Sequence, residues 1–173
     1  MELNIRKAVD SDAKSIAMIN VSSWQKTYKD IFPSDFLNGL SDKKNLDNLI
    51  IRMGENIKSN NSYLVAEFNN QIVGFCKIGQ STKEKYKNCG EIMALYVKNE
   101  VIKKGIGKQL FLEANKLLKE VYEYNVVSCI KENNSNEFCC CFSTVSKTSS
   151  TFTKALFKPS KFLLAFFIIF SFI

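Results

Sequence analysis

The stretch from residue 90 to residue 111 constrains the fold of this chain more than any other segment. It begins with an apolar run of strand length, Gly90–Val97, passes through a basic turn that contains two glycines, and ends in the start of a helical pattern. An apolar run of this length, bounded by turn residues, is typical of a buried strand. The sequence therefore predicts a strand, a short turn and a helix in direct succession.

The turn in this stretch is suited to binding an anion. Gly105 and Gly107 carry no Cβ, so backbone N–H groups can come close to a phosphate. The N-terminus of the following helix offers unsatisfied donors and the positive end of its dipole, and Lys103, Lys104 and Lys108 add full charges. The pattern predicts a phosphorylated ligand, although two glycines in a strand–helix turn also suit tight packing alone. Their spacing fits neither a Walker loop nor the three-glycine dinucleotide fingerprint.

Further strands and helices are predicted on both sides of this stretch. The pair Asn69-Asn70 separates two runs rich in β-forming residues, and asparagine suits the positive φ angles of a tight hairpin turn. These elements favour an α/β fold with a mixed sheet of five strands and helices on both faces. The predicted strands are residues 4–9, 62–68, 71–78, 90–97 and 125–130, and the predicted helices are residues 13–28, 33–40, 41–53 and 106–121.

Charge and composition exclude several kinds of function. The net charge of +7 is moderate, and residues 139–173 hold four lysines and no acid. Elsewhere the basic residues interleave with acids, so we expect no nucleic-acid surface. The absence of histidine removes histidine-based metal sites and histidine general bases, and we expect no metal. The six cysteines form no Cys-x-x-Cys pair and the N-terminus resembles no signal peptide, which predicts a reducing cytoplasm.

The final segment, residues 139–173, differs in character from the rest of the chain. Phe, Ser, Thr, Lys and Cys dominate it, and it holds eight of the fourteen phenylalanines. Residues 162–173 are almost continuously hydrophobic, but they are fewer than the roughly 20 residues that a membrane span requires, so we expect no transmembrane helix. We interpret this segment as an atypical apolar tail, for which a shifted reading frame is one explanation.

Residues 91–111 resemble the acetyl-CoA-binding core of the GNAT superfamily of N-acetyltransferases. In that family a strand ending Leu-Tyr-Val precedes a Gln/Arg-x-x-Gly-x-Gly/Ala loop. Here the strand ends in the same three residues at 95–97, and Gly105 and Gly107 match the loop. Ile102 stands at the Gln/Arg position, so one polar contact of the family is replaced by an apolar side chain.

The resemblance covers residues 1–138, and residues 23–33 are similar to a large, poorly characterised bacterial branch of the family. It implies a GNAT-like, mostly antiparallel sheet in an acetyl-CoA-binding N-acetyltransferase domain at residues 1–138. That domain would be incomplete, because the last two strands of the family would fall in the atypical tail. Phe138 matches the phenylalanine of the family's Asn-x-x-x-x-Phe-Tyr segment, but Cys139 replaces its tyrosine.

The resemblance also implies which residues hold acetyl-CoA. A splayed strand offers backbone N–H and C=O groups to the pantetheine arm, and an N–H near Leu95 polarises the thioester carbonyl as in an oxyanion hole. Asn133 matches the asparagine that approaches this arm, although a helix cap would have the same sequence. The predicted pantetheine contacts are Leu95, Tyr96 and Val97, and the predicted pyrophosphate contacts are Lys103, Lys104, Gly105, Ile106, Gly107 and Lys108.

Direct attack of an amine on the thioester requires a proton acceptor and a proton donor. Glu91 is the only acid of the central strand and the candidate general base, although a solvated carboxylate at the start of a strand would look the same. Cys139 stands where the family has its proton donor to the leaving thiolate. Trp24 and Tyr28 lie in the region that forms one wall of the acceptor site in the family, and their spacing equally suits core packing.

Three classes of function stay open at this point. The first is an N-acetyltransferase that acts on an amine of a small molecule or peptide, with polyamines, aminoglycosides, amino acids and protein N-termini all compatible. The second is a CoA-binding module without turnover, since the tyrosine and the last strands of the family are missing. The third is a protein that associates with a membrane surface, or with itself as a homodimer, through the apolar tail.

Overall fold

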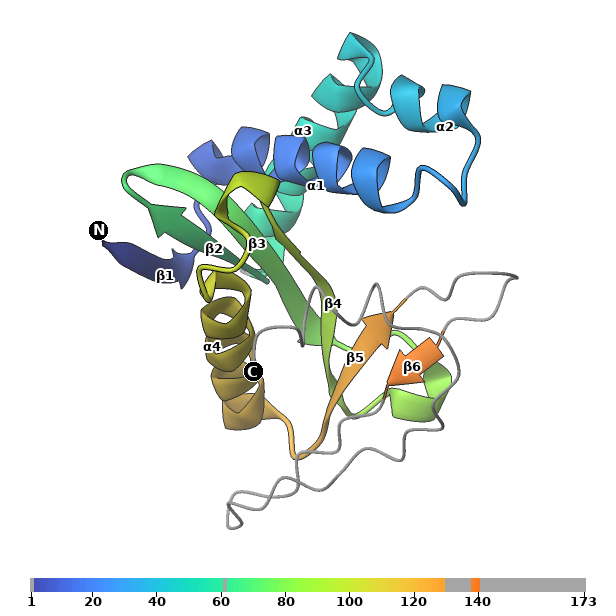
Figure 1. Cartoon of the computed structure of the whole chain (residues 1–173). Helices are drawn as coiled ribbons and strands as arrows, with labels where there is room; N and C mark the ends of the chain where they lie inside the picture. The colour runs from blue at the N-terminus through green and yellow to red at the C-terminus, as the bar shows by residue number, and fades with distance from the viewer. Residues whose placement is uncertain (1, 61, 130–137, 141–173) are drawn as a thin grey trace.

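The computed structural model describes residues 2–60, 62–129 and 138–140, and it is built around a six-stranded sheet whose strands lie side by side in chain order (Figure 1). β4 and β5 run parallel, and every other neighbouring pair is antiparallel. The predicted mixed, mostly antiparallel sheet is confirmed, and a short sixth strand adds to the five predicted. The strands are β1 (Leu3–Lys7), β2 (Tyr63–Phe68), β3 (Gln71–Gln80), β4 (Gly90–Val97), β5 (Asn125–Cys129) and β6 (Phe138–Cys140).

Helices cover both faces of this sheet, as predicted (Figure 1). α1 and α3 pack on one face, over a core that includes Val65, Phe75 and Tyr96. α4 packs on the opposite face through Ile106 and Leu110. No helix in the described ranges is long and apolar enough to cross a membrane. The helices are α1 (Ala13–Thr27), α2 (Ser34–Gly39), α3 (Lys43–Asn60) and α4 (Ile106–Val121), with single turns η1 (Asp10–Asp12), η2 (Glu84–Tyr86) and η3 (Asn99–Val101).

The predicted hairpin turn between β2 and β3 is confirmed. Asn69 and Asn70 both adopt positive φ angles, 49° and 60°. Two consecutive left-handed residues define the turn type whose twist matches that of the flanking strands, and asparagine tolerates this conformation better than most residues.

The central strand β4 carries a bulge and parts from its neighbour β5. Lys77 of β3 pairs with Ala94 while the next residue of β3 pairs with Ile92, so Met93 is the extra residue on β4. β4 pairs with β5 only over its first three residues, as far as Ile92 and Val127. Beyond that point the two strands diverge (Figure 1). Within the described part of the chain, the outer edge of β4 after Ile92 therefore has no neighbouring strand.

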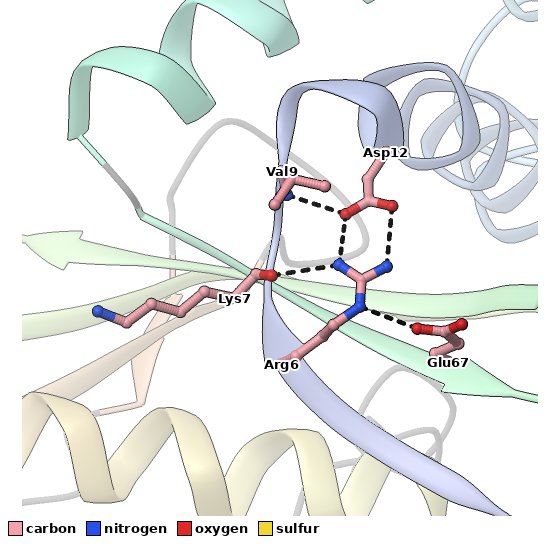
Figure 2. Close-up of polar contacts among 5 residues, drawn as sticks. All are labelled: Arg6, Lys7, Val9, Asp12 and Glu67. Carbon is pink, nitrogen blue, oxygen red and sulfur yellow. Dashed lines mark hydrogen bonds and ion pairs between the residues drawn. The ribbon is translucent and has the colours of Figure 1, made fainter.

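An ion-pair network fastens the first strand to the start of α1 (Figure 2). Arg6 donates to both carboxylate oxygens of Asp12, at 2.7 and 3.1 Å, and its Nε donates to Oε2 of Glu67 on β2 at 2.9 Å. Oδ2 of Asp12 also accepts from the backbone N–H of Val9 at 2.9 Å, which satisfies a donor at the beginning of the helical segment. Asp12 therefore joins β1 to the start of the helical segment and caps that segment.

Several sequence predictions fall outside the described residues. Asn133, residues 141–173 and the apolar run at 162–173 are among them. Cys139 is described only as part of β6, whose backbone pairs with Ser128 of β5.

We predict that Asp12 contributes stability that depends on pH. Burial by itself would raise the pKa of Asp12, but the hydrogen bonds from Arg6 and from Val9 N–H outweigh it and hold this pKa below its usual value. A depressed pKa in the folded state contributes stability above the unfolded pKa of about 3.9, and this contribution is lost as pH falls through the folded value. Asp12→Asn should therefore lower the free energy of unfolding by about 2 kcal/mol at pH 7.

Urea denaturation of the wild-type protein and this variant at pH 7 and at successively lower pH measures the effect. The difference in unfolding free energy should shrink below about pH 4. Asp35→Asn, at an exposed position of α2, is the matched control and should change little. Equal stability of the wild-type protein and Asp12→Asn at pH 7 would contradict the assignment.

Candidate functional site

The open edge of β4 presents backbone groups of Leu95 and Val97. Lys98 N–H donates to the carbonyl oxygen of Val73 on β3 at 2.7 Å. The Tyr96 carbonyl oxygen also faces β3, where it lies 3.0 Å from the position of a Cβ built on Gly74. Because alternate residues of an antiparallel strand face the same neighbour, the N–H and C=O groups of Leu95 and Val97 face the open edge. Leu95 and Val97, two of the three predicted pantetheine contacts, therefore present their peptide groups to the open edge. The peptide groups of the third, Tyr96, face β3.

The N-terminus of α4 offers a second set of backbone donors. Gly105 is its N-cap, and the first intrahelical hydrogen bond runs from Gln109 N–H to Gly105 C=O at 3.1 Å. No side chain of the described residues caps this end, so the N–H groups of residues 106–108 have no partner within the helix. The Ile106 side chain is only 2% exposed and belongs to the core, so its predicted contact can come only from its backbone.

The two glycines of the turn differ in whether the backbone conformation requires glycine. Gly105 adopts a φ of 74°, which side chains disfavour, and a Cβ there would meet no atom within 4 Å. At Gly107 a Cβ would meet the side chains of Val97 and Leu95 at 3.7 and 3.8 Å, which is ordinary contact. Tight packing therefore does not require glycine at 107. This helix end lies beside the open edge of β4, so the two sets of donors adjoin one another.

The three lysines predicted to bind the pyrophosphate differ in their contacts and backbone conformation. Lys103, Lys104 and Lys108 are all exposed. Lys104 places its Nζ 5.2 Å from the centre of the Phe68 ring on β2, a cation–π contact. Lys103 has a φ of 70°, so the turn holds a non-glycine residue in the left-handed region at a cost of about 1 kcal/mol. The turn thus combines exposed lysines with backbone N–H groups that have no partner within the helix, and both features favour phosphate binding.

Glu91 is buried in the sheet, and the interpretation of a solvated carboxylate is wrong. Glu91 is 3% exposed, and its Oε1 forms an ion pair with Nζ of Lys83 at 3.8 Å. Ile92 packs with α4, so Glu91 faces the side of the sheet that carries α1 and α3. Ala94 and Tyr96 face that side too. They can do so because the bulge at Met93 reverses the alternation of side chains along β4.

Trp24 and Tyr28 connect the helical layer to the central strand. Their rings lie 4.9 Å apart in an edge-to-face arrangement, and both side chains hydrogen-bond with the Tyr96 side chain. Burial raises the pKa of Tyr96, and these hydrogen bonds offset part of the rise. Trp24 also lines a groove of about 390 Å³ between α1, α2 and α3. The two aromatic side chains thus pack against one another, while Trp24 also borders this groove.

Two contributors to the site were missed by the sequence analysis. Lys83 lies in the loop before β4, and nothing in the local sequence indicates that it reaches Glu91. The bulge at Met93 has no local signal either, since the strand Gly90–Val97 reads as regular. Both depend on the pairing register of β3 with β4, which a hydrophobic pattern alone does not specify.

Comparisons with known proteins agree with this fold. Residues 21–138 match the family model described as the acetyltransferase (GNAT) family. The chain is 29% identical over 134 residues to the uncharacterised N-acetyltransferase YuaI of Bacillus subtilis, covering 77% of this chain and 75% of that protein. It is also 29% identical over 124 residues to a spermidine N(1)-acetyltransferase of Thermoplasma acidophilum, covering 69% of this chain and 73% of that protein.

Solved structures of acetyltransferases also resemble this chain. The crystal structure of the PaiA N-acetyltransferase of Thermoplasma acidophilum in complex with coenzyme A has a TM-score of 0.61 and 25% identity, over 78% of this chain and 83% of that one. YncA of Salmonella typhimurium, a putative acetyltransferase solved with acetyl-CoA, has a TM-score of 0.56 and 18% identity, over 74% of this chain and 70% of that one, a likeness of fold.

We predict that a carboxylate introduced at residue 107 stabilises α4 but weakens the binding of coenzyme A. Gly107→Asp places a carboxylate at the N-terminus of α4, where the helix dipole favours it. The same carboxylate should repel a pyrophosphate bound by the adjacent N–H groups. Isothermal titration calorimetry should show about tenfold weaker coenzyme A binding for Gly107→Asp than for the isosteric, uncharged Gly107→Asn. Equal affinities of the two folded variants would exclude this turn as the phosphate site.

Proposed function

Because the chain belongs to the GNAT family of acetyltransferases, we propose that it transfers the acetyl group of acetyl-CoA to a primary amine of a small molecule or peptide by direct attack. The observation that carries this proposal is the junction of the open edge of β4 with the uncapped N-terminus of α4. An extended arm with amide groups fits the first, and a diphosphate fits the second. The thioester of acetyl-CoA is linked to a diphosphate through such an arm.

In this proposal each half of the site holds one part of the cofactor. The N–H groups of residues 106–108 bind the pyrophosphate, and the exposed ammonium groups of Lys103 and Lys108 add long-range attraction. The peptide groups of Leu95 and Val97 bind the pantetheine arm. The Leu95 N–H polarises the thioester carbonyl and stabilises the charge that develops on its oxygen. Binding through backbone groups explains why Ile102 can replace a polar residue of the family without removing the site.

The amine reaches the thioester from the side of the sheet that carries α1 and α3. Its nitrogen attacks the carbonyl carbon, the carbon–sulfur bond breaks, and coenzyme A leaves as the thiolate. Glu91 faces this side and accepts the proton that the amine loses, directly or through a water molecule. The ion pair with Lys83 offsets part of the cost of burying the Glu91 charge. Cys139 stands at the position from which the family's tyrosine donates a proton to this thiolate.

A reducing cytoplasm remains the predicted location. Among the described residues, Cys76 and Cys89 form no disulfide, and burial raises the pKa of the Cys76 thiol. Self-association through the apolar tail remains a separate prediction.

The proposed base makes a kinetic prediction that also distinguishes an enzyme from a coenzyme A-binding module. Glu91→Gln keeps the shape of the side chain but removes its basicity. It should lower kcat by about 100-fold or more, with little change in the KM for acetyl-CoA. Detection of the released thiol over a range of pH measures both parameters and the pH profile.

Glu84→Gln is the matched control, because Glu84 is an exposed glutamate in the same loop region, paired only with Lys87 among the described residues. This variant should retain wild-type rates. If Glu91→Gln shows the wild-type rate and pH profile, another group accepts the proton. If coenzyme A binds but no amine releases thiol, the chain is a binding module and not an enzyme.

A further inference from the structure

The loop between β3 and β4 carries a lysine whose side chain enters the protein toward the proposed base. Nζ of Lys83 lies 3.8 Å from Oε1 of Glu91, and the side chain of Lys83 is 22% exposed while that of Glu91 is 5% exposed. The other two lysines of this loop, Lys85 and Lys87, are exposed. Lys83 is therefore the lysine of this loop that is directed inward, against the preference of an ammonium group for water.

Hydrogen bonds within the loop hold the backbone of this lysine. Ser81 N–H donates to the carbonyl oxygen of Cys89 at 2.9 Å, which brings the two ends of the loop together. Oγ of Ser81, a residue only 4% exposed, accepts from the N–H of Lys83 at 3.3 Å. The Lys83 carbonyl oxygen accepts from Tyr86 N–H at 2.8 Å. Both peptide groups of Lys83 are thus held within the loop, which fixes the point from which its side chain extends toward Glu91.

Other charged groups around this part of the sheet are directed elsewhere. Lys77 lies on the same face of β3, two residues from the partner of Glu91, but its Nζ lies 5.6 Å from the centre of the Tyr63 ring on β2, away from β4. β5 places residues 125–127 beside the start of β4, and none of them carries a charge. The charged side chains of α1 and α3 are exposed to solvent. Of these groups, Lys83 is the one that pairs with Glu91.

The chemistry of a buried base explains why such a neighbour matters. A carboxyl group removed from water favours its neutral form, and a neutral carboxyl group cannot accept a proton. A cation within about 4–6 Å favours the ionised form instead. Burial of Glu91 and the ammonium group of Lys83 therefore act in opposite directions on the state of the carboxyl group.

We propose that Lys83 is a positioning residue for acetyl transfer, whose ammonium group holds the Glu91 carboxylate in place and ionised so that it can accept the proton of the amine. This inference rests on the proposed function, because it assigns the residue that maintains its base. In this role Lys83 acts through Glu91 and need not contact the acceptor. After the transfer, the same positive charge favours release of the proton from Glu91 to water, which restores the base.

The first test removes the charge of Lys83. Lys83→Met keeps the apolar stem, and kcat at pH 7 should fall about tenfold with little change in the KM for acetyl-CoA, because burial then favours neutral Glu91. The ratio of wild-type to variant kcat should shrink as the pH rises, since a higher pH ionises Glu91 without Lys83. Detection of the released thiol over a range of pH measures this ratio. Lys83→Arg should retain the wild-type profile.

A second test separates this role from a purely structural one. In a Glu91→Gln background, where residue 91 cannot ionise, Lys83→Met should lower kcat by less than about twofold. A purely structural role would give the same loss in both backgrounds. The double variant lacks both charges of the pair, so it leaves no buried charge without its partner. Lys83→Gln should show the same pH-dependent loss as Lys83→Met and replaces it where Lys83→Met does not fold.

Lys87→Met removes an exposed lysine of the same loop, which pairs with Glu84, and should behave as wild type. A wild-type pH profile in the Lys83 variants, or an equal loss in the two backgrounds, would overturn the inference, while a lowered kcat in Glu91→Gln would leave the proposed function standing. A wild-type rate in Glu91→Gln would overturn the proposed base and the inference with it.

Discussion

The divergence of β4 from β5 is the feature on which the site depends. The two strands pair as far as Ile92 and Val127 and then separate, which leaves backbone groups of β4 facing an open edge. Unpaired peptide groups at the centre of a sheet are unfavourable unless something binds them. An extended ligand with its own amides can satisfy them, and the N-terminus of α4 beside this edge can hold an attached phosphate group. In the proposed function, the open edge of β4 and the N-terminus of α4 form one binding site.

One extra residue in β4 determines which side chains of this strand face α1 and α3. Glu91 and Tyr96 are five positions apart, so on a regular strand they would face opposite sides. The bulge at Met93 puts both on the side of α1 and α3. The proposed base and the aromatic contacts of Tyr96 consequently lie on one face of the sheet. The edge proposed for the cofactor and the face proposed for the acceptor thus meet at β4.

The sequence predicted most of the fold because its signals are local. The Asn69-Asn70 turn, the strand Gly90–Val97 and the helix after Gly105 each follow from residues close together in the chain. The site was predicted less completely. Burial of Glu91 depends on its neighbours in β3 and β5, and its contact with Lys83 depends on the path of a loop.

Titration of ¹⁵N-labelled protein with coenzyme A, followed through the backbone amide resonances, tests whether the open edge of β4 and the N-terminus of α4 bind the cofactor. We expect the largest shifts at Leu95, Val97 and residues 106–108, because these N–H groups form the new hydrogen bonds. The amides of Tyr96 and of β1, which face other strands, should shift less. Binding with the largest shifts on α2 or α3, and none at the open edge of β4 or the start of α4, would contradict it.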